Sequence, residues 1–405
     1  MQPDSHTFSV AVVGGGLAGK ACALALAQLG LQVALVAPPQ SAESGDRVYA
    51  FSQSTADLLE RLRVWQALDA ARMQPVSEMH IWGDAARGAD AALQFSAYAA
   101  GVPQLAWIAQ AGLIDAGLDA ALRFSTQVTL FTQAAQELRI DADCAEVVLA
   151  GGACLRAACV IGADGGHSWT RERAGIAADE RAYGQIAVVA NFSVGKPHRG
   201  VARQWFLGGG ARQGKPEDKA GEILALLPMP EDRVSMVWSA RAAHAKELLA
   251  LDPDALAARV NAAADGAVAA QTGGLSSATQ SKGFPLALRR AAKLAAPRVA
   301  LVADAAHVIH PLAGQGINLG LRDVAELARV FAEKESFRDL GDARLLRRYE
   351  RARQADIAAL VLATDGLQTL FSLPGPLPGL VRNLGLRAVG AVPPLRNFLV
   401  ERALA

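Results

Sequence analysis

FSVAVVGGGLAGKACALALAQLGLQVALVA, residues 8–37, is the stretch that decides the fold. Its apolar, β-branched start over 8–13 predicts a buried strand, and the glycine cluster after it predicts a tight turn. The alanine- and leucine-rich segment up to Gly30 predicts a helix with the glycine as its stop, and the run over 31–37 predicts a second strand. Together these elements form one βαβ unit.

Three glycines in the turn have the spacing of a dinucleotide-binding loop. Gly14 permits the tight turn, Gly16 lets the backbone approach a pyrophosphate, and Gly19 lets the helix pack closely on the strand. Phosphate would lie at the helix N-terminus, where unpaired N–H groups and the positive end of the helix dipole converge. A chance glycine turn has the same spacing, but the flanking strand and helix favour a dinucleotide site. The acid that ends the second strand and binds a ribose hydroxyl is replaced by Ala37.

The composition of the 405-residue chain excludes several classes of protein. A formal net charge of +1 lacks the positive field that binds nucleic acid. The 4 cysteines form no CxxC pair, which argues against a zinc ribbon or a disulfide framework and predicts free thiols in a reducing cytoplasm. The N-terminus lacks the cationic region of a signal peptide, and the uncharged run over 91–114 is too polar for a transmembrane helix.

Two later stretches carry further chemistry. They are VIGADGGHSWTRERAG, residues 160–175, and VALVADAAHVIHPLAGQGINLGLRDVAELA, residues 299–328. Together with the first glycine turn, their order and spacing resemble the FAD-dependent aromatic-ring hydroxylases, the class A flavin monooxygenases. The sequence of the last stretch resembles the ubiquinone-biosynthesis branch of that family. So do the segments DRVYAFSQST, PMPEDRVSMVWS, RRYERAR, TDGLQTLFS and RNLGL. The resemblance covers essentially the whole chain.

The resemblance implies an α/β fold with two lobes and a helical tail. We expect a discontinuous, Rossmann-like FAD-binding domain of the glutathione-reductase type over 1–75, 100–180 and 285–335. A substrate-binding β-sheet domain is expected over 76–99 and 181–284, where strand patterns dominate around one alanine-rich helix near 253–270. The C-terminal helical region is expected over 336–405.

The resemblance also implies the reaction. NAD(P)H or another electron donor supplies electrons to bound FAD, and one atom of O2 enters an electron-rich phenolic ring. The substrate of this branch is a polyprenylated phenol or benzoquinol that is hydroxylated on the way to ubiquinone. The protein would exclude water, hold the ring and stabilise charge.

Asp304 has the most direct chemical interpretation in the third stretch. Its carboxylate, at the end of a strand, is suited to accept hydrogen bonds from the hydroxyls of ribitol, and the glycines after it let a planar ring lie against the backbone. A helix is expected to begin near Asn318, with the positive end of its dipole toward a reduced flavin. The pair of Asp304 and His307 is also compatible with a surface cap or, with His310, a metal site. Zinc would need further ligands that this stretch lacks.

By resemblance, Arg47 lies near the flavin and its phosphates, and Asp164 belongs to a motif linked to both FAD and the pyridine nucleotide. Without the family, Arg47 would be a solvated charge and Asp164 part of an ordinary turn. The full set of expected cofactor-binding residues is Gly14, Gly16, Gly19, Arg47, Asp164, Asp304, Pro311, Gly314, Gln315, Gly316 and Asn318. No side chain is assigned a catalytic role, although His310 and Pro311 are candidates near the flavin, and no metal is expected.

Several positions depart from the family pattern. Ala303 replaces a motif glycine, Ala37 replaces the ribose-binding acid, and Gly112 and Asp115 stand where relatives carry an arginine and a glutamine that face the cofactor. Each lost hydrogen bond costs about 1–3 kcal/mol, so FAD affinity would fall by several decades. A cofactor-poor paralogue that binds a prenylated lipid or scaffolds other enzymes is therefore an alternative. A hydroxylase of a small soluble aromatic is a second alternative.

The substrate class suggests a location. A prenyl tail requires an apolar passage and favours a membrane surface, which the uncharged GLQTLFSLPGPLPGLV, residues 366–381, would contact between flanking arginines at 382, 387 and 396. A buried helix followed by a proline-rich loop explains the same stretch equally well. We expect a cytoplasmic protein, peripheral at the inner membrane surface. Contacts with other ubiquinone-biosynthesis proteins or with a second copy remain open.

Overall fold

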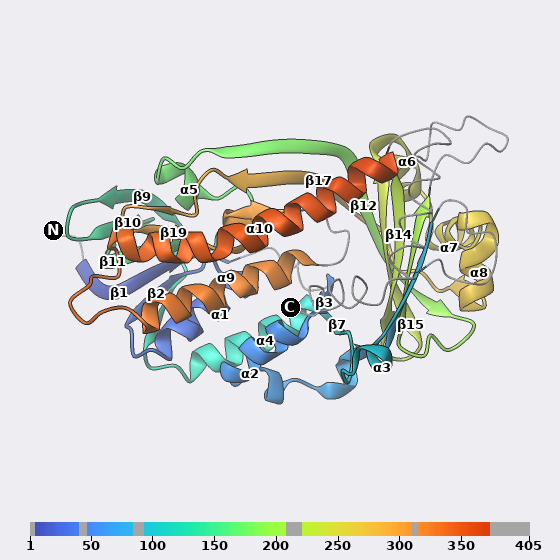
Figure 1. The fold of residues 1–405 in the computed structure, drawn as a ribbon, viewed down its shortest axis with the longest axis horizontal. Coiled ribbons are helices and arrows are strands. Elements are labelled where there is room, and N and C mark those ends of the chain that lie inside the picture. The colour runs from blue at the N-terminus through green and yellow to red at the C-terminus, as the bar shows by residue number, and fades with distance from the viewer. Residues whose placement is uncertain (1–4, 40–46, 84–92, 208–220, 310–314, 373–405) are drawn as a thin grey trace.

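The fold is known from a computed structural model of the chain. The structure describes residues 5–39, 47–83, 93–207, 221–309 and 315–372. Figure 1 shows a mixed α/β molecule in which one sheet and its covering helices lie beside a second sheet with helices on its far side. The α/β class with a second, sheet-based lobe, which the sequence predicted, is confirmed.

The first sheet has eight strands, and its central strands are parallel. Its main path runs β18-β19-β11-β1-β2-β8, with β10 and β9 added in antiparallel fashion beyond β11. The second half of β1, from Val10 to Val13, and all of β2 are buried because helices cover the faces of this parallel region, which explains the continuous apolar sequence there. The strands are β1 (Ser5–Val13), β2 (Val33–Val36), β8 (Val128–Phe131), β9 (Ala135–Ile140), β10 (Ala145–Leu149), β11 (Cys154–Gly162), β18 (Ala295–Ala296) and β19 (Val299–Leu301).

Helices from three distant parts of the chain pack on this sheet. Helix α1 contacts both α4 and α9, and α9 contacts α10 in turn. Their bounds are α1 (Leu17–Ala27), α2 (Gln53–Arg61), α4 (Ala111–Arg123), α5 (Trp169–Arg173), α9 (Gln315–Ala332) and α10 (Ala343–Ser372). The helix expected to begin near Asn318 already includes Gln315, because packing against α1 outweighs the low helix propensity of Gly316.

The second sheet has nine strands in the order β20-β17-β12-β15-β14-β13-β5-β6, with β16 beside β12. They are β5 (Glu78–Trp82), β6 (Leu93–Ser96), β12 (Ala178–Val194), β13 (Val201–Leu207), β14 (Glu222–Met229), β15 (Arg233–Arg241), β16 (Leu275–Ser276), β17 (Lys282–Ala291) and β20 (His307–Val308). One face of this sheet, with Trp205 and Trp238, packs against helices α6 (Ala242–Leu249), α7 (Pro253–Asn261) and α8 (Ala267–Thr272). In Figure 1, α7 and α8 lie on the side turned away from the first sheet.

One helix of this region differs from the expectation. The single helix expected near 253–270 is two helices, because Ala264, Asp265 and Gly266 adopt left-handed backbone conformations between them.

A small third sheet joins β3 (Val48–Phe51), β7 (Ala106–Gln110) and β4 (Gln74–Val76), and the four-residue helix α3 (Ala97–Ala100) follows β6. The antiparallel pairing of β3 and β4 with β7 brings together segments that are distant in sequence.

A long two-stranded ribbon joins the two large sheets. Strand β12 has 17 residues and pairs with β17 from Ala178–Ala291 to Val189–Lys282. Figure 1 shows the ribbon passing from the first sheet into the second. The expected boundaries at 180/181 and 284/285 fall inside these two strands, and the division into domains stays a prediction.

The C-terminal region is one long helix as far as the structure describes it. Of the stretch expected at a membrane surface, residues 366–372 belong to α10, while residues 373–381 and the arginines at 382, 387 and 396 lie outside the described residues. None of the helices in the described ranges is long and apolar enough to cross a bilayer.

Candidate active site

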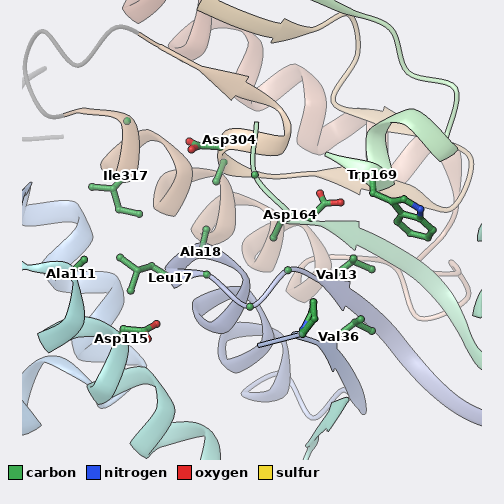
Figure 2. A pocket seen from close by; sticks show the side chains of 18 of the residues that line it. Val13, Leu17, Ala18, Val36, Ala111, Asp115, Asp164, Trp169, Asp304 and Ile317 are labelled. Carbon is green, nitrogen blue, oxygen red and sulfur yellow. The ribbon is translucent and has the colours of Figure 1, made fainter. Parts of the chain in front are cut away.

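A cavity of about 520 Å³ lies where the first sheet ends, which is a typical volume for a cofactor site. The turn after β1, the first turn of α4 and the short turn Ala303–Ala305 after β19 all contribute to its walls. Six of the sequence-predicted residues line it, namely Gly14, Gly16, Arg47, Asp164, Asp304 and Gly316. Figure 2 shows Asp164, Asp304 and Asp115 around the turn between β1 and α1.

The three glycines of the first turn have different physical roles. Gly14 has φ +131°, and a Cβ atom there would lie 2.2 Å from the carbonyl oxygen of Ala163. A Cβ atom on Gly19 would lie 1.9 Å from the carbonyl oxygen of Gly14, so Gly19 permits close packing of the helix on the turn. A Cβ atom on Gly16 would meet no atom within 4 Å. Gly16 therefore leaves space on the cavity side of the turn, where the first N–H groups of α1 begin.

Asp304 presents a carboxylate to the cavity. It has no hydrogen-bond or salt-bridge partner among the residues that the structure describes. Although the side chain is exposed to the cavity, the surrounding protein removes much of its hydration and raises its pKa, while His307 and Arg47 oppose this shift. An unpaired carboxylate of this kind is suited to accept hydrogen bonds from a polyhydroxy ligand.

Arg47 lines the cavity and also contacts the second sheet. Its guanidinium lies 4.4 Å above the ring centre of Phe284 on β17, a cation–π contact. Arg47 also lowers the pKa of Asp304 through its charge. It thus connects the cavity with the second sheet, while it stays exposed directly before β3, as the solvated-charge interpretation expects.

Asp164 lines the cavity and also caps a helix. Its carboxylate accepts hydrogen bonds from the Ser168 hydroxyl and from the backbone N–H and hydroxyl of Thr170. These contacts fix the start of α5, for which Ser168 is the N-cap. Gly165, with φ +83°, completes the turn. The ordinary-turn interpretation therefore describes the backbone correctly, while the location of Asp164 agrees with a cofactor site.

Some of the residues that depart from the family pattern line the cavity, and Ala37 does not. Gly112 and Asp115 line the cavity, and Asp115 is paired with Lys20 of α1 at 2.7 Å. Ala37 does not line the cavity, although Val36 and Pro38 beside it do. Its Cβ atom faces Gly15, since a Cβ on that glycine would lie 2.6 Å away. Ala37 is thus adjacent to the glycine turn.

Three predicted residues lie away from the cavity wall. They are Gly19, Gln315 and Asn318. The side-chain oxygen of Asn318 accepts from the backbone N–H of Ser52 and from the hydroxyl of Thr55, and its amide group donates to Ala50. Asn318 therefore joins α9 to the start of α2. The candidates His310, Pro311 and Gly314 lie outside the described residues.

A buried ionic cluster beneath the Ala303–Ala305 turn was not predicted. Asp323 of α9, which is fully buried, accepts from the backbone N–H of Ala303 at 2.9 Å, from Nε2 of His307 at 2.6 Å and from Nε of Arg353 at 2.7 Å. His307 thus pairs with Asp323 and not with Asp304. Asp323 stands within the quoted third stretch, but its partners are known only once α10 is placed. No group of potential metal ligands is found in the described part of the chain.

The sequence matches the family model described as FAD binding domain over residues 7–364, and the chain belongs to this family. The predicted class, an FAD-dependent aromatic-ring hydroxylase and monooxygenase of the ubiquinone branch, is confirmed, as is FAD as its cofactor.

Two curated relatives match almost the whole chain. The chain is 33% identical to ubiquinone hydroxylase UbiL of Rhodospirillum rubrum over 401 residues, which cover 98% of this chain and 89% of the relative. It is 31% identical to 3-demethoxyubiquinol 3-hydroxylase of Escherichia coli, with 98% of both chains covered. Among solved structures, HpxO of Klebsiella pneumoniae with FAD and uric acid has a TM-score of 0.73 at 20% identity and covers 98% of this chain and 97% of its own. That similarity shows the fold.

Proposed function

We propose that the chain hydroxylates one ring carbon of a polyprenylated phenol or benzoquinol in ubiquinone biosynthesis. The observation that carries the proposal is the cavity, which has the glycine turn on one wall and the unpaired carboxylate of Asp304 on another. The two curated relatives, named for ubiquinone and demethoxyubiquinol hydroxylation, support the substrate class.

The residues around the cavity fit FAD. The open side of Gly16 and the N-terminus of α1 suit the pyrophosphate, and the Asp304 carboxylate suits the ribitol hydroxyls. When bound, FAD supplies the electron transfer and oxygen activation that no amino-acid side chain provides. NAD(P)H or another donor is the proposed source of electrons.

An apolar row on the second sheet suits an aromatic, prenylated substrate. Val189, Val237 and Ala225 are neighbours on three strands, and all are half-buried. Side chains alternate between the faces of a sheet, so this row lies opposite the face that α6, α7 and α8 cover. Phe284 pairs with Ala187 on the same face and contacts Arg47. Phe284 links this face to Arg47 at the cavity, and we propose that the row holds the substrate ring and excludes water from it.

A visible absorption spectrum tests the proposed cofactor site. We expect the purified protein to be yellow, with stoichiometric flavin after gel filtration. A colourless protein that takes up no added FAD would instead favour the cofactor-poor paralogue, which the changes at Ala37, Gly112 and Ala303 suggest.

A substitution in the apolar row tests the substrate. Val237→Lys places a charge in the row and is expected to raise KM for a prenylated phenol while the FAD dissociation constant stays within twofold. Val237→Leu is the matched control and should retain activity. Equal activity of the Lys variant on the prenylated phenol would contradict this substrate surface.

We propose that the protein works at a membrane surface as a peripheral protein, because a prenylated substrate resides in the bilayer. Co-sedimentation with vesicles of anionic phospholipid measures this, and a chain truncated after residue 372 is the comparison. Equal binding of both chains would contradict a role for residues 373–381 and for the arginines after them, which the truncation removes.

A further inference from the structure

The turn that carries Asp304 contains an unfavourable backbone conformation. Ala303 has φ +55°, in the left-handed region that side chains other than glycine rarely adopt. An alanine there costs about 1–2 kcal/mol relative to the right-handed conformation. A conformation of this kind persists only when neighbouring contacts stabilise it.

One side-chain acceptor stabilises the strained residue itself. The N–H of Ala303 donates to Oδ2 of Asp323 at 2.9 Å. Other contacts hold the nearby chain, since Val302 directly before it donates to the carbonyl of Gly162, and the carbonyl of Ala305, two residues after it, accepts from Arg171. Asp323 therefore stabilises the conformation of the residue directly before Asp304, together with the hydrogen bond from the N–H of Ala306 to the carbonyl of Ala303.

Two neighbouring side chains keep Asp323 in the form that accepts this bond. Arg353 and His307 contact its two oxygens, and their charges and hydrogen bonds hold the pKa of Asp323 below its usual value despite complete burial. Arg353 belongs to α10 and is also paired with Asp356. The C-terminal helix thus contributes, through Asp323, to the geometry of this turn.

We propose that Asp323 is a positioning residue for FAD: it fixes the turn at Ala303 and so directs the Asp304 carboxylate into the cavity, with Arg353 of α10 keeping it in place. This inference rests on the proposed role of Asp304 in binding FAD. Asp323 itself lies beneath the turn, outside the cavity lining.

Titration of the apoprotein with FAD, followed by quenching of flavin fluorescence, tests the inference. Asp323→Asn should raise the FAD dissociation constant at least tenfold. Asp304→Asn should weaken FAD in the wild type but add little in the Asp323→Asn background, because Asp304 is already misdirected there. Ala303→Gly should restore part of the affinity of Asp323→Asn, since glycine adopts the left-handed conformation without the carboxylate.

A matched variant separates positioning from loss of stability. The Tyr349 hydroxyl of α10 donates to the carbonyl of Leu301 at 2.8 Å, in the same helix-to-sheet interface. Tyr349→Phe should lower the melting temperature but leave the FAD dissociation constant within twofold. If Tyr349→Phe weakened FAD as much as Asp323→Asn, the effect would be one of general stability and the inference would be wrong.

The outcomes also separate this inference from the proposed function. Unchanged FAD affinity in Asp304→Asn would overturn the role of Asp304 and the inference with it. Weaker binding in Asp304→Asn with unchanged binding in a folded Asp323→Asn would overturn the positioning role alone. If Asp323→Asn does not fold, Arg353→Met replaces it in the same cycle. We expect Arg353→Met to weaken FAD binding at least threefold, in a way that is not additive with Asp304→Asn. Unchanged FAD affinity in this variant would overturn the inference.

Discussion

The ammonium group of Lys20 on α1 lies 2.7 Å from a carboxylate oxygen of Asp115 on α4. Asp119, one turn further along α4, is at the same distance from Lys20. Asp115 lines the cavity, so its negative charge would face a bound pyrophosphate if the lysine were absent. Lys20 therefore balances the negative charge of Asp115, a pairing that the sequence alone did not predict.

Removing this compensation should weaken FAD binding. In Lys20→Met the two carboxylates lose their cation, and we expect a loss of about 1 kcal/mol, roughly fivefold, that diminishes with added salt. Fluorescence titration with FAD at two ionic strengths measures it. Adding Asp115→Asn to Lys20→Met should restore most of the affinity. A loss that the second change does not relieve would mean that Lys20 acts through packing.

Gly16→Val should abolish FAD retention and leave the fold intact. Gly16 has an extended backbone with φ −79°, which valine tolerates, and its side chain would enter the open space beside the turn. Circular dichroism of the apoprotein should match the wild type, and gel filtration should remove all flavin. Gly14→Val is the contrasting variant, because its Cβ clashes with Ala163 and should destabilise the fold. A folded Gly16→Val protein with stoichiometric flavin would refute the assignment of the loop.

Asp304→Asn should weaken FAD binding and stabilise the apoprotein. The lost charge-assisted contact corresponds to about 1–3 kcal/mol of binding. Because the native pKa of Asp304 is raised above 3.8, the native state retains the proton to higher pH than the unfolded state. The stability of the wild type therefore falls as the pH rises from the unfolded-state pKa of Asp304 to its higher native-state pKa. The variant has no carboxylate at this position and lacks this fall. Thermal unfolding of both apoproteins between pH 4 and 8 checks the sign, and a variant less stable at neutral pH would contradict it.

Ala303→Gly should stabilise the apoprotein by about 1 kcal/mol. The change removes the left-handed strain of Ala303, and the gain is reduced by the greater freedom of glycine in the unfolded chain. Urea unfolding measures the difference. Ala305→Gly is the control within the same turn; with no positive φ to relieve there, it should be destabilising.

Ala37→Glu should tighten FAD by about 1–2 kcal/mol, roughly tenfold, if the missing ribose acceptor is restored. Ala37 follows β2 and faces Gly15 of the glycine turn, close to the expected ribose position. Isothermal titration of the variant and of Ala37→Gln, which lacks the charge, measures the gain. Weaker binding in the Glu variant would show that the chain before Pro38 carries this side chain away from the nucleotide, and would favour the cofactor-poor paralogue.

The sequence predicted the elements whose signals are local. The βαβ unit over 8–37 was recognisable because strand and helix periodicity, a glycine turn and a glycine stop all occur within it. Gly14 and Gly16 follow the first strand of this unit, and Asp304 follows a later strand. All three line the cavity. Their roles toward FAD stay predictions.

The remaining features depend on long-range packing. The partner of His307 was sought three residues away, whereas Asp323 lies 16 residues away and Arg353 a further 30. These contacts exist because α9 and α10 pack on each other, which no local pattern encodes. Similarly, the third sheet joins strands from 48–51, 74–76 and 106–110, each too short for its periodicity to decide.

The first sheet combines the N-terminal strand β1 with strand β19 at Val299–Leu301, and this separation in sequence affects folding during synthesis. On the ribosome, β1, β2 and β11 emerge long before β19, which covers the exposed edge of β11. The cavity cannot close until α9, ending at Ala332, has been synthesised. Until then the nascent chain exposes an unpaired edge strand, which is prone to aggregation. We therefore expect FAD to bind late in translation or after it, and we expect a shortage of cofactor to reduce the yield of folded protein.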